Sequence, residues 1–375
     1  MKKILFLLTV LVSISAFSFA ATLTFDWAKD DFNQTGLKGV NCMTYDPVGQ
    51  VIVLSNYGND DLSLEKYNKD NGDLVGSQAL TVPVGHPVSA TMGFAVGAAA
   101  NGNIYITDDG GDTPPAGWHN SLFKAASSSV ATITNVNSVV ATIDFTFARN
   151  LSVVGSGANT YIAGTGSGDS GPISIWKSND AGTTAFSPWK EITGSALTPV
   201  GAAKAGVGIS PIVGSDPPQW AAGCDVVGAI NRCRIFKYNA GIGEYDWMSD
   251  ATDAEYICFD ADFDVTDGYF PMVAVFTKDG TGSGGAPPKV ELFKLNTATG
   301  TLSSLAIWTG PTIALTEGTR GSLAIDTANR KIYIAYRTVT GSTVVTMARF
   351  SYTRDPLPTP TPTPLGVTEP WGLYE

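Results

Sequence analysis

Short apolar segments separated by turns fill the chain from residue 21 to residue 354. One phrase recurs along it, in which an apolar residue stands two positions before a basic one. The basic residue falls at positions 66, 124, 177, 237, 294 and 349, so successive copies are 58, 53, 60, 57 and 55 residues apart. A near-constant period of this length predicts six copies of one structural unit. The copies are Leu64–Asn68, Leu122–Lys124, Ile175–Asn179, Ile235–Asn239, Leu292–Asn296 and Met347–Ser351.

Each unit contains further short strands before and after this phrase. A second apolar strand precedes it, as at Ile104–Ile106, and a turn such as Thr297–Gly300 follows it and leads into another strand. A small apolar strand comes earlier still. Four antiparallel strands per period are typical of a β-propeller blade. The predicted first strands are Val40–Tyr45, Phe94–Ala98, Leu151–Val154, Val207–Ile209, Tyr256–Phe259 and Leu323–Ile325.

The predicted fold is therefore all-β, a six-bladed propeller of four-stranded antiparallel blades. Helical periodicity of useful length is absent, so the alternatives are a pair of β-sandwiches or a β-solenoid, and neither explains the period as well. The sixth copy runs into prolines without a fourth strand, whereas Thr22–Trp27 is a strand without a blade. We expect Thr22–Trp27 to complete the last blade and close the ring.

The two ends of the chain differ from this domain. Lys2 and Lys3 precede an apolar run that ends in Ser18-Phe19-Ala20, as in a secretory signal peptide. We expect residues 1–20 to be removed on export, leaving a protein that is secreted, periplasmic or at the cell surface. Residues 21–354 then form the propeller. Residues 355–375 are a Pro/Thr-rich spacer with a short terminal peptide, which is either disordered or a docking segment.

Composition and charge narrow the partners. With 41 glycines, 43% hydrophobic and 15% charged residues, the chain has the composition of a turn-rich globular β protein. Its formal net charge is −11, which becomes more negative once Lys2 and Lys3 leave with the signal peptide. This charge argues against nucleic acid and anionic membranes as partners. No later apolar segment is long enough to span a bilayer, so glycans, proteins, cations and neutral ligands stay open.

Four cysteines in an exported chain can be oxidised. Cys224 and Cys233 flank a predicted turn, and this spacing suits a disulfide across a hairpin. Cys42 and Cys258 lie in equivalent apolar strands of separate blades, so we expect two buried thiols there. A zinc site is not indicated, because the chain has no CxxC motif and only two histidines.

The repeated basic residue admits two interpretations. It could form a ring of ligand-binding cations. A position filled alike in all six units more often serves the blade itself, because the aliphatic stem covers apolar surface while the charge reaches water. We favour the role in the scaffold.

Two segments resemble known propeller families. Asn101–Asp108 and Lys294–Gly300 resemble blade phrases of extracellular six-bladed propellers of the NHL and sugar-lactonase type. Ser178–Phe186 is similar to the Asp-box of sialidases, and in that family it is a folding turn remote from the active site. The rest of a sialidase site is not evident, although Arg149 and Arg320 both precede first strands and are candidate ligand contacts.

The loops that lead into first strands meet the loops between second and third strands on one face, the usual ligand side of a propeller. Asn41, Asn150 and Glu255 stand at such positions in alternate blades. The resemblance to lactonases implies a divalent cation held there by Asn, Glu and Asp, and these oxygen ligands suit calcium. The alternative is that the three side chains cap backbone groups at the strand ends.

One loop on this face carries an unusual concentration of polar and aromatic side chains, between Asp108 and Asn120. An indole ring can cover the apolar face of a sugar while carboxylates accept its hydroxyl hydrogens. The alternative is a long solvated loop that its tryptophan anchors. The candidate ligand residues are Asp108, Asp109, Asp112, Trp118, His119 and the nearby His86.

A further acidic segment has alternating carboxylates at Asp260, Asp262 and Asp264. We expect it between a first and a second strand, on the opposite face. It is a candidate for structural calcium, although an EF-hand loop would place glycine differently and end in a glutamate. An ordinary Asp-rich turn is the alternative.

The sequence contains no Ser/His/Asp motif, P-loop or dinucleotide fingerprint. The leading hypothesis is therefore an exported, non-catalytic binding or surface-associated propeller that recognises carbohydrate or another extracellular polymer. The alternative is a metal-dependent hydrolase of lactonase type, or a glycan-cleaving enzyme that uses the same mouth. The sequence leaves open whether the protein is an enzyme.

Overall fold

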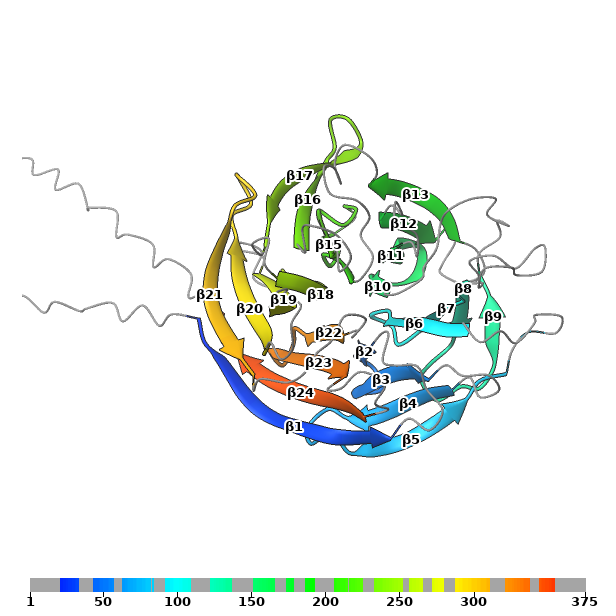
Figure 1. The fold of residues 1–375 in the computed structure, drawn as a ribbon. Coiled ribbons are helices and arrows are strands. Elements are labelled where there is room, and N and C mark those ends of the chain that lie inside the picture. Colours follow the sequence, from blue (N-terminus) through cyan, green and yellow to red (C-terminus); the bar gives the residue numbers. More distant parts are fainter. Residues whose placement is uncertain are drawn as a thin grey trace, which may run out of the picture.

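The protein is described by a computed structural model that covers residues 21–33, 43–56, 63–81, 83, 92–108, 122–136, 151–165, 173–178, 186–192, 206–214, 216–224, 233–251, 256–265, 272–279, 287–310, 321–337 and 344–354. Within these residues the strands form six four-stranded sheets. Figure 1 shows the sheets arranged around a common centre. The predicted propeller arrangement of four-stranded antiparallel blades is confirmed.

Five sheets contain four strands that are consecutive in the chain. They are β2 (Met43–Asp46), β3 (Val51–Asn56), β4 (Ser63–Asn68) and β5 (Leu74–Ala79); β6 (Met92–Ala98), β7 (Ile104–Asp108), β8 (Leu122–Ala125) and β9 (Ile133–Asn135); β10 (Leu151–Val154), β11 (Tyr161–Thr165), β12 (Ile173–Ser178) and β13 (Phe186–Ile192); β14 (Val207–Ile209), β15 (Trp220–Cys224), β16 (Cys233–Asn239) and β17 (Glu244–Asp250); and β18 (Tyr256–Asp264), β19 (Met272–Asp279), β20 (Pro288–Leu295) and β21 (Leu302–Thr309). The sixth sheet combines β22 (Gly321–Asp326), β23 (Lys331–Arg337) and β24 (Val344–Tyr352) with β1 (Leu23–Asn33).

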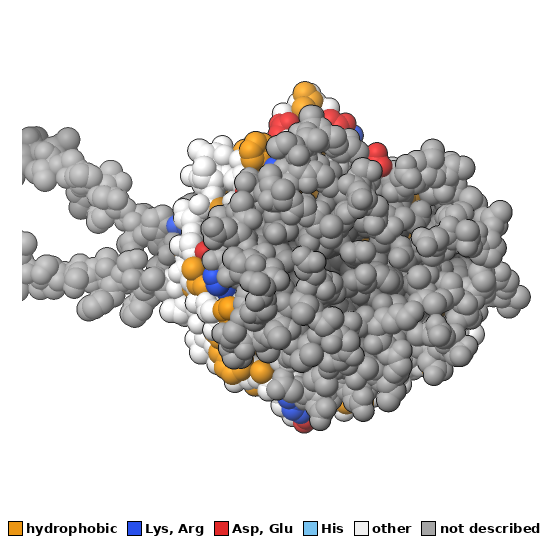
Figure 2. All heavy atoms as spheres, viewed as in Figure 1, with side chains coloured by type: hydrophobic (Ala, Val, Ile, Leu, Met, Phe, Trp, Pro, Cys, Tyr) orange, Lys and Arg blue, Asp and Glu red, His pale blue; other side chains and the backbone are white. Residues whose placement is uncertain are grey.

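Burial decreases from the centre of the molecule outwards. Every residue of β14 and β15 is buried, in keeping with their apolar composition. The outer strands β5 and β21 carry several exposed positions, as expected for a sheet with one solvated face. Figure 2 shows hydrophobic side chains reaching the surface along the edge where β21 and β1 lie. The core lies between neighbouring sheets, for example where the rings of Tyr105 and Phe186 meet edge to face at 5.4 Å.

The innermost strands contact one another around the centre. The contacts run from β2 to β6, β10, β14, β18 and β22, and β22 also contacts β2. Each of these strands has a hydrogen-bonded neighbour on its outer side only, so its inner edge faces the centre and the adjacent blade.

The strand predicted at Thr22–Trp27 pairs with the last repeat, as expected. It forms β1, which is longer than predicted and runs from Leu23 to Asn33 antiparallel to β24. The pairing contains irregularities that the apolar pattern does not indicate, including one between Phe25 and Trp27. Asp26 lies at this irregularity and accepts hydrogen bonds from side chains of the same sheet. They come from Arg349 Nε at 2.8 Å, Lys331 Nζ at 3.3 Å and Ser351 Oγ at 2.7 Å.

The repeated basic residues lie in the third strand of every sheet. In three of the six sheets the side chain reaches the turn between the third and fourth strands of the next blade, whereas Lys177 Nζ lies over the ring of Tyr161 in its own sheet. Lys66 Nζ donates to Ser129 Oγ at 3.0 Å, Lys237 Nζ donates to the Thr297 carbonyl at 2.7 Å, and Arg349 donates to the Lys69 carbonyl at 2.8 Å. These contacts support the predicted role in the scaffold.

Several predictions fall on parts of the chain outside the described residues. These are the signal peptide at residues 1–20, the tail at residues 355–375, and residues 179–185 of the turn that resembles an Asp-box. In the part of the chain that is described, no helix has the length and apolar character needed to cross a membrane.

Candidate functional site

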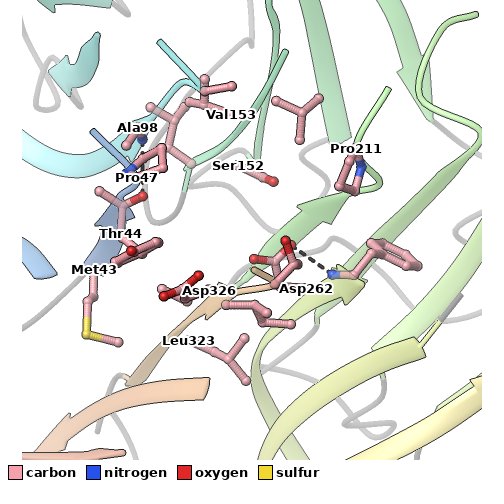
Figure 3. A pocket seen from close by; sticks show the side chains of 18 of the residues that line it. Met43, Thr44, Pro47, Ala98, Ser152, Val153, Pro211, Asp262, Leu323 and Asp326 are labelled. Atoms are coloured by element: carbon pink, nitrogen blue, oxygen red, sulfur yellow. Dashed lines mark hydrogen bonds between the residues drawn. The ribbon is translucent and has the colours of Figure 1, made fainter. Parts of the chain in front are cut away.

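A central cavity of about 290 Å³ is the candidate site. Its walls are built from the innermost strands β2, β6, β10, β14, β18 and β22 and from turns that follow them, such as Pro47, Gly155 and Pro211. Most of the lining is small or apolar. Figure 3 shows Asp262 on β18 and Asp326 at the end of β22 among these side chains. A volume near the lower end of the range for ligand pockets suits a small molecule or one end of a larger one.

The inner edges of these strands carry backbone N–H groups that need acceptors, because buried donors are costly when unsatisfied. At three seams between neighbouring blades, a hydroxyl side chain of one blade accepts from an inner-strand N–H of the next. Thr44 Oγ1 accepts from Ala98 N at 3.1 Å, Ser152 Oγ from Ile209 N at 3.1 Å, and Ser322 Oγ from Met43 N at 3.0 Å.

At two other seams a glycine of one blade lies very close to the neighbouring blade. A Cβ atom on Gly97 would lie 2.4 Å from Cγ2 of Val153, and one on Gly208 would lie 2.4 Å from the Ala261 carbonyl oxygen. These glycines are therefore required by the distance between blades and not by an unusual backbone conformation.

The seam between β18 and β22 differs from all of these, because carboxylate side chains accept the hydrogen bonds of its backbone N–H groups. Asp260 accepts from Leu323 N at 2.8 Å, and Asp262 accepts from the backbone N–H of Ile325. Residues 260 and 262 are two positions apart on β18, so their side chains lie on the same face of that strand. Residues 323 and 325 are likewise two positions apart on β22, so their backbone N–H groups lie along the same edge of that strand. Two hydrogen bonds between a carboxylate and a backbone N–H group therefore follow one another along this seam.

Asp260 and Asp264 are fully engaged in the scaffold. Asp260 is 2% exposed and also accepts from Ala261 N at 2.9 Å and from Ser322 Oγ at 3.1 Å. Asp264 is 3% exposed, and its charge is balanced by Arg354, whose Nε lies 2.8 Å from Oδ2. The hydroxyl of Tyr352 donates to the same oxygen at 2.8 Å.

Asp262 is in a different position. It lines the cavity and is partly exposed, whereas Asp260 and Asp264 are buried. Within the described part of the chain, no ion pair involves Asp262. Its other hydrogen bond comes from Phe263 N at 2.8 Å. Burial raises the pKa of Asp262 to about 7, and the nearby charge of Asp264 adds to the rise. The hydrogen bonds from the backbone of Phe263 and Ile325 favour the charged form and oppose it.

The described lining makes the cavity acidic. It contains the carboxylates of Asp260, Asp262 and Asp326 and no Lys, Arg or His side chain. Asp326 is held in the turn that follows β22, where it accepts from Asn329 N at 3.1 Å and from Asn329 Nδ2 at 2.7 Å. Of the three carboxylates, Asp262 has the fewest partners among the described residues. The cavity therefore disfavours anions and suits hydroxylated or cationic ligands.

The predicted location of the acidic segment is wrong. Asp260, Asp262 and Asp264 lie within β18 and not in a turn between the first and second strands. Their carboxylates have separate partners, and among the described residues no group of three or more acidic, His or Cys side chains is placed to hold a metal ion. The alternation of Asp with apolar residues in the sequence is the signal that could have indicated a strand. Ala261 and Phe263 are buried between the carboxylates, as expected for a strand with a period of two.

The other predicted ligand contacts and metal ligands lie outside the described residues, apart from Asp108, which ends β7 and whose side chain is not described. The structure therefore does not test whether they converge. They are His86, Asp109, Asp112, Trp118, His119, Arg149 and Arg320 among the candidate ligand contacts, and Asn41, Asn150 and Glu255 among the candidate metal ligands.

Comparison with known proteins supports the fold. No protein-family model matches the chain. No curated protein matches it at a significant level. A solved structure of a protein of unknown function from Dyadobacter fermentans has a TM-score of 0.52 at 10% identity, covering 89% of this chain and 98% of that one.

Two further solved structures have lower scores. A DUF4623 family protein from Bacteroides eggerthii has a TM-score of 0.48 at 12% identity and covers 88% of this chain and 76% of that one. A gluconolactonase from Xanthomonas campestris has a TM-score of 0.44 at 11% identity and covers 87% of each chain. At such identities the likeness concerns the fold alone.

Proposed function

We propose that this protein is an exported, non-catalytic binding propeller, and that its central cavity takes a small hydroxylated ligand, such as a terminal sugar of an extracellular carbohydrate. The proposal includes a complete ring of six blades in which β1 supplies the fourth strand of the last one. It is supported by the pairing of β1 with β24 and by the contact of β22 with β2.

The observation that carries the proposal is the carboxylate at position 262. At three other seams a hydroxyl satisfies the same kind of backbone N–H, so the scaffold does not require a charge there. Placing a carboxylate at such a site raises its pKa, which means that the surroundings disfavour its charge. A costly group that the fold could replace with a serine is a candidate for ligand binding.

The neighbouring groups fit a hydroxylated ligand. Thr44 and Ser152 also line the cavity, and each hydroxyl that accepts a backbone hydrogen bond keeps its own hydrogen to donate. Asp262 supplies an acceptor, and apolar walls such as Leu323 and Val153 can contact C–H groups. Hydrogen-bond donors, an acceptor and apolar surface together match the hydroxyl and C–H groups of a sugar ring.

The experiment compares two variants of the mature protein on a glycan array, with titration calorimetry on the strongest glycan. Asp262→Ser keeps a hydroxyl for Ile325 N, as Ser152 does for Ile209 N, and removes the charge. We expect it to fold and to bind at least tenfold more weakly, because hydrogen bonds to a charged group contribute about 1.5–3 kcal/mol. The matched control, Trp247→Ala, removes an exposed aromatic of the outer strand β17 and should bind as the wild type does.

Unchanged affinity of Asp262→Ser, in a protein that melts cooperatively, would place the ligand elsewhere. In that case the loop with Trp118 and His119 becomes the site to test. Loss of glycan binding in Trp118→Ala with full binding in Asp262→Ser would favour that loop.

A second candidate function is hydrolysis of a lactone, and the raised pKa of Asp262 favours it. A carboxylate with a pKa of about 7 suits a general base at neutral pH. In this reaction Asp262 takes a proton from a water molecule that attacks the lactone carbonyl. The ring C–O bond breaks, and the leaving oxygen receives the proton from Asp262. Acid release from a sugar δ-lactone that disappears in Asp262→Ser would overturn the non-catalytic proposal.

The metal-dependent form of this alternative depends on Asn41, Asn150 and Glu255. It is tested by elemental analysis of the purified mature protein. Stoichiometric calcium that is lost in Asn150→Ala and Glu255→Ala, together with lactone turnover, would support it. Turnover that survives removal of divalent cations with a chelator would leave Asp262 as the base.

A further inference from the structure

Cys224 and Cys233 face each other directly across two paired strands. Cys224 is the last residue of β15, Cys233 is the first residue of β16, and the two are register partners. Both side chains are fully buried. The structure contains them as thiols.

The backbone geometry identifies the type of pair that they form. The N–H of Cys224 donates to the Gly206 carbonyl at 2.8 Å, on the side of β14. The carbonyl of Cys233 accepts from Ala251 N at 2.7 Å, on the side of β17. Both backbones therefore direct these groups away from each other, which makes the two residues a non-hydrogen-bonded pair of an antiparallel ladder.

Such a pair suits a covalent bond. The Cα atoms of directly opposed residues in a non-hydrogen-bonded pair lie about 4.5 Å apart, with their side chains close together. A disulfide requires Cα atoms between about 4.4 and 6.8 Å apart. The bond can therefore form without moving either strand.

The surroundings of the pair are apolar. The two cysteines belong to a buried cluster that includes Ile235, Ala251 and Phe293. An apolar setting disfavours thiolates and keeps dissolved reductants away from a bond once it has formed. Oxidation therefore has to precede the final packing of the blade.

We propose that Cys224 and Cys233 form an intramolecular disulfide in the mature protein. The two thiols give up two protons and two electrons to an external disulfide, through a mixed disulfide that the second thiolate resolves, and the acceptor leaves as a dithiol. The bond closes the eight residues from position 225 to position 232 at the base of the connection between β15 and β16. It stabilises the blade mainly by restricting the unfolded chain.

The test does not depend on export or on ligand binding. The mature chain is refolded with reduced and oxidised glutathione, denatured without reductant, alkylated and mapped by peptide mass spectrometry. We expect one peptide pair linked through Cys224 and Cys233, and alkylation of Cys42 and Cys258 alone. Alkylation of Cys224 and Cys233, or a link from either of them to another cysteine, would overturn the proposal.

Thermal unfolding gives a second measurement. We expect reduction under denaturing conditions to lower the melting temperature of the refolded wild type by several degrees. Cys42→Ala should keep this sensitivity to reductant, and the double variant Cys224→Ala/Cys233→Ala should lose it. A wild type with the same melting temperature in both redox states would contradict a stabilising bond.

Discussion

Asp262 accepts a hydrogen bond from the backbone N–H of Ile325, across the seam between β18 and β22. Ser152 does the same for Ile209 across another seam, with a neutral hydroxyl at 3.1 Å. The comparison separates the structural part of the role of Asp262 from its charge. The seam needs an acceptor for the Ile325 N–H group, and a neutral hydroxyl can fill that role without the negative charge.

The stability of the protein should depend on pH through this group. The pKa of Asp262 is about 7 in the folded state, above its ordinary value of 3.8, so the folded protein holds this proton more tightly than the unfolded chain. Its contribution to stability is present below about pH 4 and is lost as the pH rises to about 7. The loss is on the order of a few kcal/mol. Melting temperatures of the wild type and Asp262→Ser between pH 4 and pH 8 should converge at low pH and diverge in favour of the variant at high pH.

The seam between β14 and β18 should not tolerate a side chain at position 208. A Cβ there would meet the Ala261 carbonyl at 2.4 Å, and backbone on both sides cannot give way without moving a blade. We expect Gly208→Ala to lower the free energy of unfolding by at least about 2 kcal/mol. Urea unfolding measures this.

The matched control is Gly76→Ala on the outer strand β5, where an added Cβ meets nothing within 4 Å. It should leave stability unchanged within about 0.5 kcal/mol or raise it slightly. Equal effects of the two substitutions would show that the close approach at Gly208 is not limiting.

Asp26 should be important for holding β1 in the last sheet. It is 16% exposed and is approached by both Arg349 and Lys331. Asp26→Ala leaves two cations without this partner, and we expect a loss of about 2–3 kcal/mol. In contrast, Asp73 pairs with Lys29 at an exposed position, and Asp73→Ala should cost at most about 1 kcal/mol in the same denaturant titration. A smaller effect at Asp26 than at Asp73 would mean that β1 is held by its backbone bonds alone.

The propeller should end at Arg354. This residue pairs with the buried Asp264 and donates to the Thr327 carbonyl at 3.0 Å, while Thr353 N donates to the Thr22 carbonyl at 3.0 Å. A chain of residues 21–354 should have the same melting temperature as a chain of residues 21–375. Truncation after residue 352 leaves the Asp264 carboxylate buried without its cation and should lower the melting temperature by several degrees. Equal melting of both truncated chains would remove Arg354 from the domain.

The sheets and their order could be predicted from the sequence because each blade repeats one short phrase. The pairing of β1 could be predicted too, since the last repeat lacks a strand that Thr22–Trp27 can supply. Even the scaffold role of the repeated basic residue, seen at Lys237, follows from a position filled alike in every blade.

The candidate site could not be predicted in this way. Carboxylates are rare in buried strands, so the segment from Asp260 to Asp264 predicts a calcium-binding loop or an Asp-rich turn between two strands. The role of these carboxylates depends on Leu323 and Ile325, more than fifty residues away, whose backbone N–H groups become their neighbours only in the folded arrangement of the sheets. Relationships between blades are three-dimensional and leave no local pattern.

The most direct test of the account is a comparison of wild type and Asp262→Ser by titration calorimetry with the strongest glycan from the array, at pH 8 where the carboxylate is ionised. The account predicts a variant that is at least as stable as the wild type at this pH and that binds at least tenfold more weakly. A variant that is folded and binds with wild-type affinity would contradict it, and Asp262 would then be a structural acceptor that happens to carry a charge.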